Sequence, residues 1–229
     1  IGMDVMLPEA RDYFADAGAN VDGERVRIPA GLIMQALATV PSQFTFHARN
    51  PDKTLRIGGG WMAFGTVGSA PNSSSLERGR RPGNLEDYRD FLKLAQSFNC
   101  IDFISGYPVE PIDVHASVRH LVALKDMALM TDKPFHAYSL GLERIRDGIE
   151  IARIARGVSH EQLETEPSLF TIINTNSPLK MDVPMLQGVI EMARRNQIVC
   201  ITPFTLAGAM APVTVAGALV QQNAEALAG

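Results

Sequence analysis

The chain has few cysteines and no surplus of charge. Only two cysteines, Cys100 and Cys200, occur among its 229 residues. Each stands alone in an apolar segment, so we expect two buried thiols rather than a disulfide or a metal pair, in a reducing compartment. The 21 basic and 25 acidic residues leave a net charge of −4, with no sustained run of either sign. That balance argues against nucleic acid as a partner.

Long apolar runs are also missing. Stretches such as residues 207–219 are interrupted by Gly and Pro and are too short to cross a bilayer, and no signal-peptide pattern opens the chain. We therefore expect a soluble, cytoplasmic protein that does not bind membranes. The hydrophobic content of 46% supports one large core and excludes disorder. Because the first residue is Ile1 rather than Met, we expect a fragment of a longer protein.

Residues 1–83 have a mixed α+β character. The pattern predicts helices over residues 8–17 and 30–40, a short strand at 26–29, and a hairpin of 43–47 with 54–57. From residue 58 to residue 83 the composition turns to Gly, Ser, Pro and Arg, which is typical of loops. We place a boundary there, with an N-terminal elaboration over 1–83 and a second domain over 84–229.

The second domain repeats a helix followed by an apolar strand. Helices are expected from residue 84 to about 98 and over 114–130, 142–155, 184–195 and 213–228, with strands at 101–104, 135–138, 169–173 and 198–201. The strands recur every 29 to 34 residues, which suits one β/α unit of a buried parallel sheet. A doubly wound sheet remains an alternative, but no Gly-rich phosphate turn follows any strand. We expect an α/β fold, a (β/α)8 TIM-type barrel of which about half is present.

Polar side chains gather where the predicted strands end, and in β/α barrels such positions carry the chemistry. Asn174 and Asn176 follow one strand, and a turn that caps the next helix is an equally good interpretation of each. His136 lies on an apolar strand, where a core histidine is more common than a catalyst. Tyr138 and Phe204 suit core packing, or a cation if their rings converge. Thr202 ends the last strand.

Other motifs give no site. His115 and His120 lie on different faces of the predicted helix, so they do not form a helical zinc pair, and we expect no metal ligands. The arginines of the Gly-rich loop (Arg78, Arg80 and Arg81) fit a solvated loop better than an anion site. The three glycines at 58–60 lack the residues of a P-loop.

Four segments resemble the trimethylamine methyltransferase family. The longest is residues 202–225 (TPFTLAGAMAPVTVAGALVQQNAE), and the others are Asn174 to Leu179 (NTNSPL), the Ile28-Pro29 pair before a helix, and Phe46 to Pro51 (FHARNP). The resemblance spans nearly the whole chain. It implies a β/α barrel with an N-terminal elaboration, in which a methyl group passes from trimethylamine, or from a quaternary amine such as glycine betaine, to a cobalt corrinoid carried by a separate protein.

The resemblance also guides the choice of site residues. It implies an amine pocket, which we expect to be lined by Asn174, Asn176, His136, Tyr138, Thr202 and Phe204, with Glu225 behind it. It places the catalytic groups beyond Gly229, and we expect a homo-oligomer. One alternative is a lyase or aldolase-like barrel, although Lys133 and Lys180 lie near strand ends rather than on them. A second is a scaffold that binds the corrinoid protein without catalysis.

Overall fold

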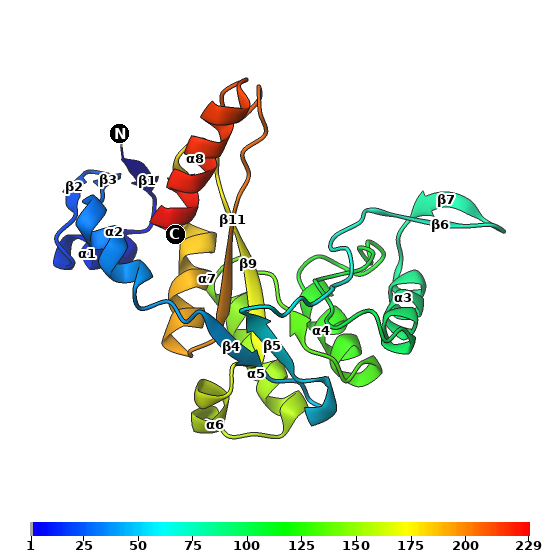
Figure 1. Cartoon of the computed structure of the whole chain (residues 1–229). Coiled ribbons are helices and arrows are strands. Elements are labelled where there is room, and N and C mark those ends of the chain that lie inside the picture. The colour runs from blue at the N-terminus through cyan, green and yellow to red at the C-terminus, as the bar shows by residue number, and fades with distance from the viewer. Residues whose placement is uncertain (1) are drawn as a thin grey trace.

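The computed structural model describes residues 2–229 and shows a mixed α/β protein (Figure 1). Its main sheet is parallel, with strand order β11-β9-β8, formed by β8 (Phe135–His136), β9 (Leu169–Thr175) and β11 (Ile198–Pro203). Two parallel bridges extend this sheet, because Ile104 pairs with Phe135 and Gly65 pairs with Phe103. Five segments therefore run parallel, side by side, in the order of the chain.

Helices cover one face of this sheet. They are α3 (Leu85–Ser97), α4 (Arg119–Met130), α5 (Leu142–Arg156) and α7 (Val183–Arg194). Local chemistry fixes their ends: the Asn84 side chain accepts a hydrogen bond from the Asp87 N–H and caps α3, and Asp182 caps α7 in the same way. The main core lies between helices and sheet and includes Tyr88, Leu92, Ile104, Leu124, Met127, Ile145 and Leu169, all almost fully buried.

The opposite face of the sheet, here called the inner face, is the one that the helices do not cover. Leu169 and Ile173 of β9 belong to the buried cores on the helix side. Because side chains alternate along a strand, Phe170, Ile172 and Asn174 lie on the inner face. In the register of the sheet, these three pair with Ile198, Cys200 and Thr202 of β11, which share that face.

The N-terminal residues build a second sheet against β9 and α7. Its order is β10-β1-β3-β2, formed by β1 (Met3–Val5), β2 (Asn20–Asp22), β3 (Arg25–Arg27) and β10 (Lys180–Met181), with helices α1 (Pro8–Asp16) and α2 (Ala30–Leu37) beside it. Strand β1 pairs in parallel with β10, so residues near the chain start are hydrogen-bonded to residues far along it. Helix α8 (Val215–Ala228) lies next to this sheet (Figure 1).

Two hairpins complete the fold. The first joins β4 (Gln43–Phe46) to β5 (Leu55–Gly58) through the short helix η1 (Pro51–Lys53), and it lies at the amino ends of the parallel strands. There the His47 N–H donates to the Pro167 carbonyl at 2.8 Å, and the Phe46 ring meets Phe170 edge to face. The second hairpin, β6 (Asn72–Ser75) and β7 (Gly79–Pro82), extends away from the body (Figure 1).

Several sequence predictions are confirmed and others are wrong. The helices predicted over 8–17, 142–155, 184–195 and 213–228, and the hairpin of 43–47 with 54–57, are all present within a residue or two. The helix expected from residue 114 begins at Arg119, and the short helix α6 (His160–Thr165) was not expected. The region 58–83 is not all loop, since it holds one bridge of the parallel sheet and the β6–β7 hairpin.

The prediction of two buried thiols is wrong, because Cys100 and Cys200 are both exposed. Cys200 lies on the inner face, which no helix of residues 2–229 covers, and Cys100 lies in the turn between α3 and the next segment. Helix α2 likewise buries none of its apolar side chains. No helix in the described part of the chain is long and apolar enough to span a bilayer.

Candidate functional site

His136 is fully buried at the point where β8 ends. Its Nε2 atom accepts a hydrogen bond of 3.0 Å from the Ile172 N–H of β9, in the place of a strand carbonyl. Burial lowers the pKa of His136 from 6.5 to about 3, so the imidazole is neutral at neutral pH. Because Nε2 accepts, the ring proton is on Nδ1, and that atom is buried without a hydrogen-bond partner.

Tyr138 lies two residues further along the same face and connects three segments of the sheet. Its hydroxyl forms a 2.5 Å hydrogen bond with Ser69 Oγ and accepts another of 3.1 Å from the Tyr107 N–H. Its ring meets His136 and Tyr107 edge to face, at centroid distances of 4.5 and 4.7 Å. Gly106 has a φ of +91°, and any Cβ there would collide with the Tyr138 hydroxyl, so this close approach requires glycine.

Asn174 and Thr202 face each other across β9 and β11. They are register partners, and Thr202 Oγ1 donates a hydrogen bond of 2.6 Å to Asn174 Oδ1. Asn174 is exposed and Thr202 is half-buried, and both lie on the inner face. The Asn174 amide N–H groups form no hydrogen bond within residues 2–229 and can donate to a ligand. Phe204, two residues beyond Thr202, is half exposed.

Asn176 has a different setting from Asn174. Its side-chain N–H donates to Asp182 Oδ2 at 3.2 Å, and its Oδ1 accepts from the Asp182 N–H at 3.0 Å. The backbone N–H of Asn176 also donates to the Lys180 carbonyl. These bonds tie the end of β9 to the first turn of α7, and the amide is already paired.

Glu225 of α8 binds the segment that follows Asn174, residues 175–179. Its fully buried carboxylate accepts hydrogen bonds from the hydroxyls of Thr175 and Ser177, from the Leu179 N–H at 2.8 Å and from Gln221 Nε2 at 2.9 Å. Burial alone would raise the pKa of this carboxyl, but the four donors outweigh it and lower the pKa. Glu225 is therefore a charged anchor for residues 175–179, just beyond Asn174.

The structure thus joins the predicted residues in pairs. His136 contacts Tyr138, and Thr202 bonds to Asn174, and both pairs lie on the inner face. The carboxyl ends of these parallel strands are here called the mouth. Asn174 and Thr202 lie at the mouth, whereas His136 lies opposite Phe170, four residues before Asn174 in the register, and is therefore deeper in the sheet. Asn176 turns toward Asp182 instead. The sequence analysis did not select Ser69, whose hydroxyl bonds to Tyr138. Ser69 follows the parallel segment that contains Gly65, and this position after a strand end is the feature that could have identified it.

The two lysines of the lyase alternative have different settings. Lys133 is buried at the amino end of β8, where its ammonium group donates to the Ala95 and Phe98 carbonyls at the end of α3, so its amine does not reach the carboxyl ends of the parallel strands. Lys180 lies on β10, where it is the register partner of Asp4 of β1. Among residues 2–229, no group of three or more His, Cys, Asp or Glu side chains is arranged to hold a metal ion.

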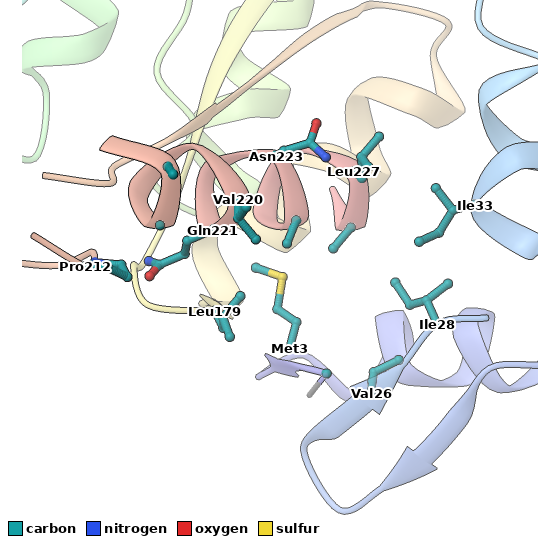
Figure 2. Close-up of a pocket in the computed structure, with 15 residues that line it drawn as sticks. Met3, Val26, Ile28, Ile33, Leu179, Pro212, Val220, Gln221, Asn223 and Leu227 are labelled. Carbon is teal, nitrogen blue, oxygen red and sulfur yellow. The ribbon is translucent and has the colours of Figure 1, made fainter. Parts of the chain in front are cut away.

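An apolar groove lies elsewhere, between α8 and the N-terminal sheet (Figure 2). Its volume is about 830 Å³, and its apolar lining includes Met3, Val26 and Ile28 on one side and Val220 and Leu227 of α8 on the other. None of the six predicted pocket residues lines it. An apolar surface of this kind suits packing against other apolar groups rather than an ammonium ion.

Comparisons with known proteins agree with one another. The sequence model of the trimethylamine methyltransferase family matches residues 1–229. The chain is 36% identical over its whole length to a glycine betaine methyltransferase of Desulfitobacterium hafniense, of which it covers 48%, and 30% identical to a trimethylamine methyltransferase of Methanosarcina mazei, of which it covers 47%. The chain therefore spans about half the length of the curated relatives that it matches.

Proposed function

This chain belongs to the trimethylamine methyltransferase family, and from that premise we propose that it forms one half of a methyltransferase. The enzyme transfers a methyl group from trimethylamine, or from a quaternary amine such as glycine betaine, to a corrinoid carried by a partner protein. The names of two relatives, a glycine betaine methyltransferase and a trimethylamine methyltransferase, support both amines as candidates. The catalytic groups that complete the site belong to sequence beyond Gly229.

The proposal includes a closed β/α barrel. Five parallel segments in chain order, with helices on one face only, are the arrangement that a barrel wall has. On the inner face Phe170 is buried against the Phe46 and Phe103 rings, but Ile172 is only half-buried and Cys200 is exposed, so in water this part of the sheet would leave an apolar surface open. Further β/α units would cover that face and turn the mouth into a cavity. Separate domains at 1–83 and 84–229, the homo-oligomer and the cytoplasmic location stay predictions.

The observation that carries the proposal is that the mouth is lined with neutral, electron-rich groups. An amine leaves a methyl carbon readily only when its nitrogen is positively charged, so the site must accept a cation. A protonated histidine would repel that cation, but His136 is neutral because burial lowers its pKa to about 3. The aromatic ring of Tyr138, which is partly exposed and is held by its edge-to-face contact with the buried Tyr107, attracts alkylammonium groups.

The residues at the mouth have separate tasks in this proposal. The Tyr138 ring binds the ammonium group, and Asn174, held by its bond to Thr202, orients the amine substituents. Glu225 fixes the loop that follows Asn174. A corrinoid in the Co(I) state supplies the nucleophile for the methyl group when the partner protein brings it to the mouth. The hydroxyls of Ser69 and Tyr138 bond to each other and hold the ring in place.

The experiment is methyl transfer to a purified corrinoid protein reduced to Co(I). We expect the complete enzyme to consume trimethylamine or glycine betaine and to release one equivalent of dimethylamine or dimethylglycine for each corrinoid methylated. The cobalt absorption spectrum follows the acceptor, and mass spectrometry follows the amine. Tight binding of the corrinoid protein with no turnover of either amine would refute the enzyme and favour the scaffold.

A further inference from the structure

The β6–β7 hairpin forms an arm, defined here as residues 71–83. Its two strands pair from Asn72 with Pro82 to Ser75 with Gly79, and the Gly83 N–H closes the base on the Pro71 carbonyl at 3.1 Å. The lower part of the arm packs on the body, where Ser73 is buried and Arg81 pairs with the buried Asp87. The rest of the arm extends clear of the helices (Figure 1).

The tip of the arm exposes an apolar side chain to water. Leu76, between the two strands, has a relative exposure of 102%. A two-stranded ribbon without further packing is only marginally stable in water, and both of its edges offer unpaired backbone groups to another chain. An arm of this kind gains stability from a surface that covers it, which indicates a binding partner.

The charge of the arm indicates the chemistry of that partner. Three arginines lie on or next to β7, and two of them, Arg78 and Arg80, are exposed. Arg78 lies 3.9 Å from Glu86, a loose pair between two exposed side chains, and Arg80 forms no ion pair in the described chain. The one acidic residue of the arm is Glu77, so three arginines outweigh it, and the arm is a positive feature on a protein whose net charge is −4. It fits an acidic surface.

The base of the arm is joined to the mouth. The arm follows the parallel segment that contains Gly65, so it rises from the carboxyl end of the sheet. Just before the arm, the Ser69 N–H donates to the Tyr107 carbonyl at 2.7 Å, and the Ser69 hydroxyl bonds to Tyr138. The Glu110 N–H donates to the Ala70 carbonyl at 2.8 Å. A partner held by the arm therefore lies next to the proposed amine pocket.

We propose that the arm docks the protein that carries the corrinoid, through an acidic patch on that protein which meets Arg78 and Arg80. This inference rests on the proposed function, because it takes the carrier from it. The alternative occupant, a second copy of the chain, would have no reason to approach the mouth. The arm binds the carrier protein and makes no contact with the corrinoid itself.

Reversing the charge of the arm separates docking from chemistry. The variant Arg78→Glu with Arg80→Glu is compared with a matched control, Arg27→Glu with Lys125→Glu, which reverses two exposed charges away from the arm. Two acceptors are used with each enzyme, the corrinoid protein and free cob(I)alamin. We expect the arm variant to bind the corrinoid protein on the order of tenfold more weakly, with a smaller salt dependence, because like charges now face each other. The arm variant should methylate free cob(I)alamin at the wild-type rate. The control variant should methylate both the corrinoid protein and free cob(I)alamin at wild-type rates.

The other outcomes are decisive as well. Equal affinity of the arm variant and wild type for the corrinoid protein would overturn the arm as a docking surface while leaving the proposed function intact. A change in oligomeric state by sedimentation, with unchanged affinity for the corrinoid protein, would show that a second copy binds the arm and would also overturn the proposal. Failure of the wild-type enzyme to methylate either acceptor would refute the proposed function, and the arm proposal with it.

Discussion

The buried imidazole of His136 should make the protein less stable as the pH falls. In the unfolded chain this histidine takes up a proton around pH 6.5, whereas in the folded protein burial holds its pKa at about 3. Between these two values the unfolded state binds more protons, so stability is present above pH 6.5 and is lost as the pH falls toward 3. The linkage relation gives a loss of about 2 kcal/mol between pH 7 and pH 5 from this one group.

Urea unfolding of the wild type and of His136→Gln, each at pH 7 and pH 5, measures this effect. Glutamine has an oxygen that can accept from the Ile172 N–H in place of Nε2, but it does not titrate. Burial also lowers the pKa of His47, but its effect on the pH dependence of stability is the same in both proteins and cancels in the comparison. We expect the wild type to lose about 2 kcal/mol more than the variant between the two pH values. Equal losses in both proteins would show that His136 is solvated or charged, and the neutral mouth would be refuted.

Three further changes test single elements of the account. Glu225→Gln should lower the free energy of unfolding in urea by about 2 kcal/mol, since four donors lose a charged acceptor; an unchanged free energy of unfolding would contradict the role of Glu225 as an anchor. Asn176→Ala should lower the melting temperature, because it removes both hydrogen bonds to Asp182; an unchanged melting curve with abolished corrinoid methylation would instead place Asn176 in the amine pocket. In the complete protein a thiol reagent should label Cys100 quickly and Cys200 slowly, because a closed barrel covers the inner face; equal rates would argue against closure.

Much of the fold could be predicted because its signals are local. Asn84 caps α3 and Pro184 lies in the first turn of α7, and the apolar periodicity of the helices gives their lengths. The strand predicted at 135–138 is present as β8, but its early end could not be predicted, because it ends where the His136 side chain accepts the bond that a backbone carbonyl would take. The arm lacks the alternation of apolar residues that marks a buried strand, so its sequence predicts a loop.

The site was predictable only in part, for a similar reason. Position at a strand end selects Asn174, Thr202, His136 and Tyr138, and the parallel register places them on one face. Contacts between distant residues give no local signal: Ser69 meets Tyr138 across 69 positions of sequence. The exposure of Cys200 depends on which face the helices cover, and strand periodicity does not reveal that.

The most direct test of the neutral aromatic mouth replaces Tyr138 with leucine and with phenylalanine and measures the KM for the amine in methyl transfer to free cob(I)alamin. Phenylalanine keeps the ring and leucine removes it. A cation over an aromatic face contributes about 0.5 to 2 kcal/mol, so we predict that Tyr138→Leu raises KM by roughly 2-fold to 30-fold and that Tyr138→Phe leaves it near the wild-type value. Equal KM values in Tyr138→Leu and wild type would place the ammonium group away from these rings and contradict the account.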